Sequence, residues 1–382
     1  MIRVNRAQRA KPHEMAAPVG GWNNRDSVVA MRPEDAISLV NWFPNQSSVN
    51  ARRGYQRLIA LTGGQSCQQL IPYEIGGVSK LLAMSGGKLF DTADNTQLAT
   101  GKTSNYVSYA HMSTRLVMCN GIDAPFSYNG SAVVAHGFTD ATVTLDFADL
   151  SFVMAFNSRL YFIEEDTQSF WYGGVGAITG ALEKFDLSLI GGFSGKLKIL
   201  TAITQDGGDG ADDIFVAIFS GGDVVAYKGT DPGDAANWTK VGVYKIGQPL
   251  SRFGHIANGG DVTIITSRGY ETLVRSTREG EGVKLRSMAS DKIQNEVTQV
   301  IKQTGVSDKW RLQLYNKGQM LIFQAPLATT IRHHVRNIDT GAWCRFALPN
   351  IVSFAQLGTV LYCGAVNSVV HTFDVGDNDD GE

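Results

Sequence analysis

The order of apolar and polar positions along this chain predicts a repeated pair of β-strands. Each unit has a short, continuous apolar run, a turn, and a second strand that carries an aromatic or long apolar residue. Continuous apolar runs are typical of strands covered on both faces, whereas alternating runs are typical of strands with one face in solvent. The first strands of the pairs begin at Leu81, Leu116, Leu160, Ile214, Val262, Leu321 and Leu361.

The spacing of these pairs indicates a β-propeller. Successive first strands lie 35, 44, 54, 48, 59 and 40 residues apart, and a four-stranded propeller blade takes about 40–50 residues. A large β-sandwich, which also has short strands at regular intervals, is the alternative fold. The longer period favours the propeller. We therefore expect an all-β fold, a β-propeller of about six blades over residues 56–374, without the Trp-Asp dipeptide of WD40 proteins.

One segment has the period of a helix instead. Within residues 290–304, the apolar positions Ile293, Val297, Val300 and Ile301 fall on one helical face. Ser290 is a suitable N-cap and Gly305 a suitable end of the helix. We expect one amphipathic helix inserted between two blades, packed on the ring or against a partner.

Two terminal segments differ from the repeats. Residues 1–55 are locally basic and rich in turn residues, which predicts an extended N-terminal arm that contacts a neighbouring subunit or another protein. Residues 375–382 are acidic, which predicts a disordered tail. The start of the chain has no apolar core of a signal peptide, and no apolar run reaches about 18 residues, so we expect no membrane span.

The overall charge argues against a protein that grips nucleic acid. The formal net charge is −2 and the isoelectric point is about 6.4. Proteins that bind DNA tightly use an excess of Lys and Arg to displace counterions from the phosphates. Any contact of this chain with DNA is therefore expected to be weak or local.

Candidate chemical sites in the sequence are better explained structurally. The acidic loop at residues 206–213 places Gly208 and Gly210 where a calcium loop needs oxygen ligands, which favours a solvated hairpin. The glycines at 174–180 lack the strand and helix of a dinucleotide fold. Adjacent His333 and His334 would point to opposite faces of a strand. The four cysteines form no CxxC pair, which indicates buried apolar residues. We expect no catalytic residue, cofactor or metal site, and no enzymatic activity.

The arm carries the motifs of a recognisable family. These are Gly20-Gly-Trp-Asn-Asn-Arg-Asp-Ser, Met31-Arg-Pro-Glu-Asp-Ala, Asn41-Trp-Phe-Pro and Val49-Asn-Ala-Arg-Arg-Gly-Tyr. In this order they resemble the N-terminus of the tail nozzle proteins of short-tailed bacteriophages, a family that includes packaged-DNA-stabilisation proteins. Segments 157–162, 238–250 and 261–273 continue the resemblance, which runs discontinuously over about residues 19–275. The motifs are short, and their order and spacing carry the likeness.

The resemblance implies a virion structural protein. Such a subunit would form a ring, a homo-hexamer, below a head-to-tail adaptor protein and beside other tail proteins. The ring would close the channel, retain the packaged double-stranded DNA and pass it at ejection without sequence-specific binding. Its place would be the virion tail, after assembly in the host cytoplasm. Candidate assembly residues are Trp22, Asn41, Trp42, Phe43, Arg53 and Tyr55.

Proteins of two other classes share the predicted fold. A propeller that degrades polysaccharide would bring carboxylates from several blades together at the central channel. A propeller that binds carbohydrate would expose aromatic side chains at one mouth of the channel. Both remain alternatives to the tail protein at this point.

Overall fold

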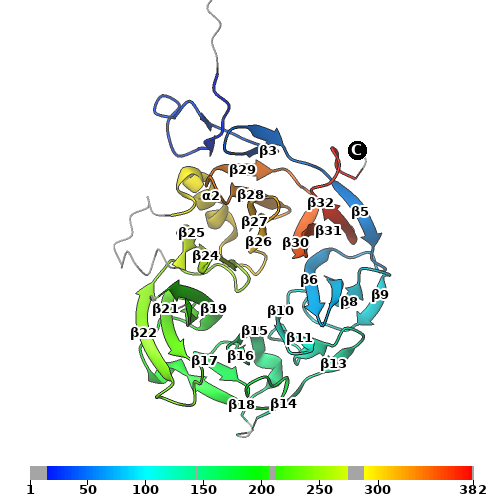
Figure 1. The fold of residues 1–382 in the computed structure, drawn as a ribbon, viewed down its shortest axis with the longest axis vertical. Coiled ribbons are helices and arrows are strands. Elements are labelled where there is room, and N and C mark those ends of the chain that lie inside the picture. The colour runs from blue at the N-terminus through cyan, green and yellow to red at the C-terminus, as the bar shows by residue number, and fades with distance from the viewer. Residues whose placement is uncertain (1–14, 141, 143, 207–210, 274–287, 381–382) are drawn as a thin grey trace, which may run out of the picture.

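Seven small sheets surround a common central axis in the computed structural model (Figure 1). The structure describes residues 15–140, 142, 144–206, 211–273 and 288–380. Within them the chain is an all-β propeller of seven blades with one short α-helix. The predicted fold class is confirmed, and the expected count of about six blades is one too few.

The blades are numbered here along the chain. Blade 1 consists of β6 (Cys67–Ile75), β7 (Val78–Ser85), β8 (Lys88–Asp91) and β9 (Thr96–Ala99), and blade 2 of β10 (Ser108–Met112), β11 (Arg115–Cys119), β12 (Phe126–Tyr128) and β13 (Val133–Ala135). Blade 3 consists of β15 (Leu150–Phe156), β16 (Arg159–Glu164), β17 (Ser169–Tyr172) and β18 (Thr179–Asp186), and blade 4 of β19 (Leu197–Asp206), β20 (Ala211–Phe219), β21 (Asp223–Gly229) and β22 (Trp238–Lys245). In blade 3, β14 (Gly137–Asp140) adds a fifth strand parallel to β18.

The remaining blades include a short sheet and a composite one. Blade 5 consists of β23 (His255–Asn258), β24 (Asp261–Thr266) and β25 (Gly269–Thr272). Blade 6 consists of β26 (Arg311–Tyr315), β27 (Met320–Pro326), β28 (Ile331–Asn337) and β29 (Trp343–Phe346). Blade 7 consists of β30 (Ile351–Leu357), β31 (Val360–Ala365), β32 (Val369–Phe373) and β5 (Tyr55–Ala60). The first strand of each blade lines the central axis (Figure 1).

The strand pairs expected from the sequence are the second and third strands of every blade. In blade 1, for example, the pair Leu81–Met84 and Lys88–Asp91 lies in β7 and β8. Leu82, Ala83 and Met84 are fully buried. These strands read as continuous apolar runs because side chains on both of their faces meet a neighbouring blade. Seven sequence pairs therefore correspond to seven blades.

The ring is closed by pairing the start of the propeller with its end. Strand β5 is the outermost strand of blade 7 and runs antiparallel to β32, with Tyr55 opposite Phe373 and Ala60 opposite Val369. Blade 7 then packs on blade 1 through β30 and β6. At that contact the Ser353 hydroxyl donates a hydrogen bond of 2.7 Å to the carbonyl of Cys67.

The predicted helix is present between blades 5 and 6. A short 3-10 turn, η5 (Asp291–Ile293), leads into α2 (Gln294–Thr304). Ile293, Val297 and Val300 are buried against the ring, and α2 contacts β25 and β27. Gly305 ends the helix with φ of 65°, and its N–H donates to the carbonyl of Ile301 at 2.8 Å.

The described part of the arm, residues 15–54, is folded against blade 6 and projects from the ring at the top of Figure 1. It contains two small sheets. Strand β1 (Gly21–Trp22) pairs in parallel with β2 (Asp35–Ala36), and β3 (Trp42–Pro44) pairs in antiparallel with β4 (Val49–Ala51). Strand β3 lies beside β29 of blade 6.

The described end of the chain is also held against the ring. The N–H of Asp380 donates to the carbonyl of Tyr55 at 2.7 Å, and the N–H of Gly54 donates to the carbonyl of Gly376 at 3.2 Å. Asp379 accepts a hydrogen bond of 2.7 Å from Arg52. Acidic composition predicts a disordered tail, but these hydrogen bonds join Gly376, Asp379 and Asp380 to residues 52–55.

Candidate functional site

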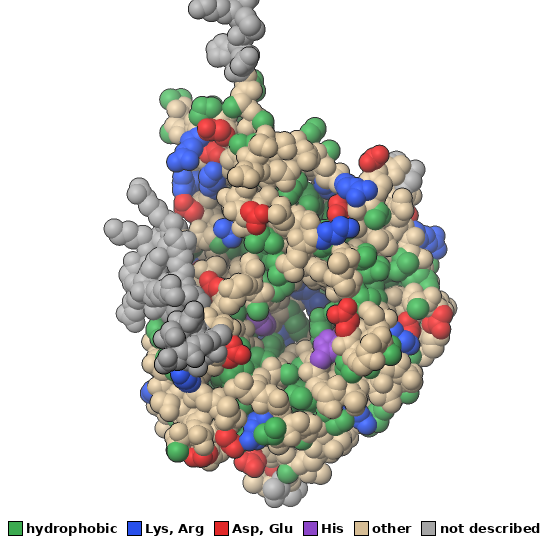
Figure 2. Space-filling model, in the orientation of Figure 1, with side chains coloured by type: hydrophobic (Ala, Val, Ile, Leu, Met, Phe, Trp, Pro, Cys, Tyr) green, Lys and Arg blue, Asp and Glu red, His purple; other side chains and the backbone are tan. Residues whose placement is uncertain are grey.

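The arm exposes a group of large apolar side chains. Val29 is 98% exposed and Trp42 is 51% exposed, although both belong to a folded segment. The exposed apolar set of the arm comprises Met15, Val28, Val29, Ile37 and Trp42. Figure 2 shows hydrophobic side chains on the part of the arm that projects from the ring. Exposed apolar side chains gathered on one segment are typical of a surface that contacts another protein.

Ionic and hydrogen-bonding contacts fasten the arm to the start of the helix. The ammonium of Lys292 donates to the carbonyl of Gly20 at 2.8 Å and to the carboxylate of Asp35 at 2.7 Å. The buried amide of Asn23 also donates to Asp35, at 2.9 Å. Arg25 forms an ion pair with Asp291. The exposed apolar set is therefore presented on a positioned segment.

Packed aromatic residues fasten the arm to blade 6. Trp22 is buried, and its ring meets the edge of the His334 ring at 5.8 Å between centroids. Phe43 is buried against Phe346, with centroids 6.5 Å apart. Gly21 has φ of 80°, and a Cβ atom there would lie 2.6 Å from the backbone nitrogen of Trp343. Close approach of the two backbones thus requires glycine at this position.

Asn41 organises the connection between the two small sheets of the arm. Its backbone has φ of 60°, a conformation that asparagine tolerates better than most residues. Its side-chain oxygen accepts hydrogen bonds from Arg52 Nε at 3.1 Å and from the N–H of Ala347 at 2.8 Å. Its own N–H donates to the carbonyl of Arg345 at 2.8 Å. Asn41 therefore holds the arm in shape.

The six candidate assembly residues have different positions. Trp42 and Arg53 are exposed, whereas Trp22, Phe43 and Tyr55 are buried within the chain. The ring of Tyr55 contacts the edge of His371 at 4.9 Å in blade 7. Sequence reasoning missed Met15, Val28, Val29 and Ile37. Their signal was apolar residues within a turn-rich segment that has no strand period.

The two adjacent histidines have separate environments, as their place in a strand predicts. Both lie in β28 and are fully buried. His334 Nδ1 is 2.8 Å from the hydroxyl of Tyr270, whereas the His333 ring faces Phe354 at 5.5 Å. Burial lowers the pKa of His333 to about 3 and also lowers the pKa of His334.

The other motifs considered for chemistry do not form a site in the described structure. Residues 207–210 of the acidic loop lie outside the described residues. The glycines at 174–180 lie between β17 and β18 and enter the latter strand, without the helix of a nucleotide-binding fold. The four cysteines are free and buried, as expected. Among the described residues, no three His, Cys, Asp or Glu side chains are grouped as metal ligands would be.

The central channel of the propeller contains a cavity. Its volume is about 580 Å³, within the range of roughly 300–1,000 Å³ that is usual for small-ligand pockets. The cavity is lined from six blades, and a second cavity of about 330 Å³, which includes residues of β19 in blade 4, shares several of its walls. Figure 2 shows the face hollowed at its centre, with histidine and basic side chains visible inside.

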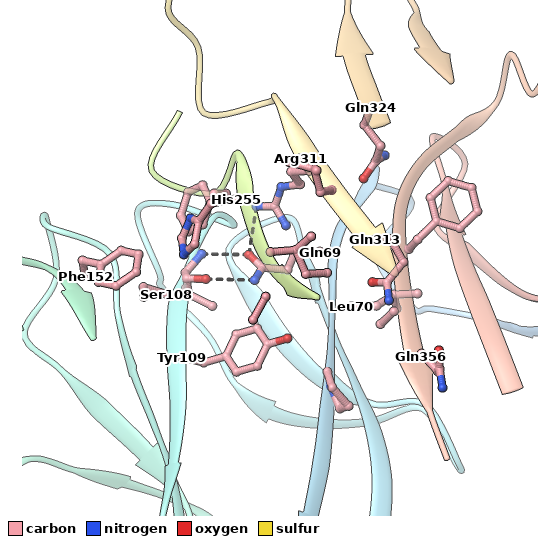
Figure 3. Close-up of a pocket in the computed structure, with 18 of the residues that line it drawn as sticks. Gln69, Leu70, Ser108, Tyr109, Phe152, His255, Arg311, Gln313, Gln324 and Gln356 are labelled. Atoms are coloured by element: carbon pink, nitrogen blue, oxygen red, sulfur yellow. Dashed lines mark hydrogen bonds between the residues drawn. The ribbon is translucent and has the colours of Figure 1, made fainter. Parts of the chain in front are cut away.

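Polar groups in this channel are amides, hydroxyls, an imidazole and a guanidinium. They belong to Gln69, Ser108, Tyr109, His255, Arg311, Gln313, Gln324 and Gln356, which Figure 3 shows around the cavity. The residues that line either cavity include no Asp or Glu. The paired carboxylates of a glycosidase are thus not found in the described lining.

Comparison with known proteins relates the chain to others by fold. No protein-family model matches it, and no curated protein sequence matches it. The β-propeller domain of Cps50 (Swd1) from Myceliophteria thermophila is similar, with a TM-score of 0.52 and 8% identity over 84% of this chain and 99% of that one. Sqt1 from Saccharomyces cerevisiae has a TM-score of 0.48 at 9% identity, over 85% and 98%. YCF48 from Cyanidioschyzon merolae has 0.46 at 11%, over 84% and 98%.

The likeness to the Cps50 domain supports the propeller architecture and nothing finer. At such low identity a shared fold does not imply a shared function. Among the described residues, no helix is long and apolar enough to cross a membrane.

Proposed function

We propose that this protein is a structural subunit of a short-tailed bacteriophage tail, in the ring of the tail nozzle. The proposal rests on the resemblance of the arm to that family and on one structural observation. The segment that carries the resemblance is a folded attachment outside the ring, and it exposes Met15, Val28, Val29, Ile37 and Trp42. A partner surface on this segment would bury those side chains.

The partner proposed for the exposed apolar set is a second copy of this chain. One face of the propeller and the projecting arm are different surfaces, so a contact between them is heterologous and closes into a ring when the rotation permits. The proposed ring is a hexamer attached to the head-to-tail adaptor. The arm suits this role because Lys292, Asp35 and Asn23 fix its position before any partner binds.

In this proposal, DNA passes between the subunits and not through the propeller. The central cavity of about 580 Å³ has the size of a small-ligand site. The near-neutral charge of the chain suits a wall that DNA must slide past, since each strong Arg–phosphate contact would add to a salt-dependent grip. The ring would retain the genome mechanically until ejection.

The experiment measures self-association of the purified full chain by light scattering over a range of concentrations, alone and with the adaptor protein. The variants are Trp42→Ser and Val29→Ser. The control is Leu189→Ser, because Leu189 is 84% exposed in the 3-10 turn η2 (Leu187–Leu189), directly after β18. In Figure 1, β18 lies on the opposite side of the ring from the arm. Loss of a central apolar contact should weaken association about tenfold or more in the arm variants only. Thermal unfolding should be unchanged in all three, since the side chains are exposed.

Two results would overturn the proposal. One is a chain that stays monomeric at every concentration and also with the adaptor. The other is association that Leu189→Ser weakens as much as Trp42→Ser does. Electron microscopy of assembled particles, with a label on the chain, would then place the protein inside or outside the tail.

A further inference from the structure

Arg311 holds a fixed position in the central channel. It is the first residue of β26, the innermost strand of blade 6. Its guanidinium lies 4.8 Å from the ring centroids of both Tyr106 and Phe253. Its Nη2 donates a hydrogen bond of 3.2 Å to the side-chain oxygen of Gln69, as Figure 3 shows. Two aromatic contacts and one hydrogen bond therefore orient the group before any ligand arrives.

This guanidinium has no carboxylate partner among the described residues. Its Nε is buried and makes no hydrogen bond there. The carboxylate of Asp308 is engaged by Arg252, whose Nε lies 3.1 Å away. Burial lowers the pKa of Arg311 to about 10, so the side chain still carries a positive charge at neutral pH. A poorly solvated cation without a counter-charge is unfavourable and is stabilised by an anion.

The charge of the cavity limits the ligand to a single negative charge. Arg311 is the one Lys or Arg side chain among the residues that line the cavity. His255 also lines it, and burial lowers the pKa of this histidine to about 4, so it is neutral at pH 7. A carboxylate matches one guanidinium in charge and in planar geometry. A phosphate dianion would leave an unbalanced charge in the channel.

The rest of the lining suits an apolar body with a few polar atoms. Phe152, Phe253 and Phe354 supply aromatic walls. His255 also lines the cavity. Gln313 and Gln324 add amides at the cavity wall (Figure 3). From this geometry we propose that the central channel binds a small monocarboxylate, with the carboxylate on Arg311 and the apolar body among the phenylalanines.

The experiment titrates the purified full chain by calorimetry and ligand-observed NMR. The probes are benzoate, hexanoate, and benzamide as the uncharged analogue of benzoate, with inorganic phosphate at matched ionic strength. A tetrapeptide with a free C-terminus and its C-terminal amide test whether a chain end supplies the carboxylate. Saturable one-to-one binding is expected for at least one of the carboxylates. No such binding is expected for benzamide, phosphate or the amidated peptide.

Variants of Arg311 distinguish the contribution of the guanidinium to binding from that of the rest of the cavity. Arg311→Met should weaken carboxylate binding about tenfold or more, because charge-assisted hydrogen bonds are lost. Arg311→Lys should weaken it less, since the charge stays and the planar fork is lost. The control is Arg57→Met on the exposed side of β5, which should bind as the unaltered chain does.

Arg311→Met should also unfold at a higher temperature than the unaltered chain without ligand, because an unpaired buried charge is removed. The proposal is wrong if no carboxylate binds saturably, if benzamide or phosphate binds as well as benzoate, or if Arg311→Met binds benzoate unchanged. If Arg311→Met does not fold, the proposal is still tested by the comparison of benzoate with benzamide and by the Arg311→Lys variant. None of these results depends on self-association, which the Arg311 variants should leave intact.

Discussion

Tyr55 pairs with Phe373 across the seam of the ring, although Tyr55 begins the first propeller strand and Phe373 ends the last. The pairing makes blade 7 a sheet built from both ends of the propeller. Without β5, strand β32 would lose its outer partner, and the backbone groups that now pair with Tyr55–Ala60 would be free. The stability of the whole ring therefore depends on a contact between the first and the last strand of the propeller.

Truncation tests this dependence. A chain that begins at Leu61 lacks β5 and should lose cooperative thermal unfolding, because blade 7 is incomplete. A chain that begins at Arg52 keeps β5 and should unfold cooperatively. A synthetic peptide of residues 52–61 added to the shorter chain should restore protection in hydrogen exchange at β32. Cooperative unfolding of the shorter chain alone would contradict the prediction.

A second prediction concerns the contact between blades 7 and 1. A Cβ atom on Gly364 would lie 2.4 Å from Ser353 Oγ and 2.6 Å from Cys67 Sγ. Gly364→Ala should therefore destabilise the fold by about 1–3 kcal/mol, the usual range for overpacking. Gly192→Ala is the matched control, because nothing lies within 4 Å of its Cβ position and its φ is not positive. Urea unfolding measures both, and equal effects would count against the argument.

The arm should detach when its closest backbone contact is disturbed. In Gly21→Ala, the new methyl group would meet the backbone of Trp343 and the residue would keep a strained positive φ. We expect residues before Gly54 to become sensitive to limited proteolysis while the propeller itself remains resistant. Gly76→Ala has a similar φ but open space around the Cβ position, so it isolates the cost of the backbone angle. If Gly76→Ala exposes the arm equally, the close contact is not the cause.

Acidification should destabilise the fold through buried histidines. Burial lowers the pKa of His333 to about 3 and that of His255 to about 4, whereas both titrate near 6.5 when unfolded. Between these values the unfolded chain binds more protons, so the free energy of unfolding falls as the pH falls. At pH 5, His333 alone should account for about 2 kcal/mol of this loss.

Denaturant unfolding at pH 7.5, 6 and 5 measures the effect. His333→Leu should give a shallower dependence on pH than the unaltered chain, because one titrating group is removed. The exposed substitution Leu189→Ser should leave the pH dependence unchanged. Parallel pH curves for the unaltered chain and His333→Leu would show that His333 is not responsible.

The sequence allowed the propeller to be recognised because burial on both faces leaves a clear pattern. The second and third strands of each blade, such as β7 and β8, are continuous apolar runs. The spacing between successive strand pairs is unequal, and it is longest where α2 is inserted between blades 5 and 6. This spacing did not determine how many blades form the ring. The end of the helix at Gly305 was predicted because the apolar period and the terminal glycine are local features. The expected N-cap was wrong, since Ser290 makes no capping hydrogen bond and α2 begins at Gln294.

Other features could not be read because they depend on distant parts of the chain. The pairing of β5 with β32 has no local signal, so Tyr55 was interpreted as part of the arm. Trp22 and Phe43 were expected at an assembly surface, yet blade 6 covers both. Arg311 alternates with Leu312 and Leu314 in an ordinary strand pattern. Only the ring brings it beside Tyr106 and Phe253.

The seam between β5 and β32 also sets an order of events during synthesis. Ribosomes make β5 before the blades, and its partner Val369–Phe373 follows only after all the other propeller strands have been made. Until β32 is made, the backbone N–H and C=O groups along the edge of β5 have no partner strand. Strands with such an unpaired edge tend to pair with other chains. The exposed Gln56 and Arg57 place a polar and a charged group on β5, and such groups disfavour pairing of the strand with another chain. The ring can close only after β32 has been synthesised.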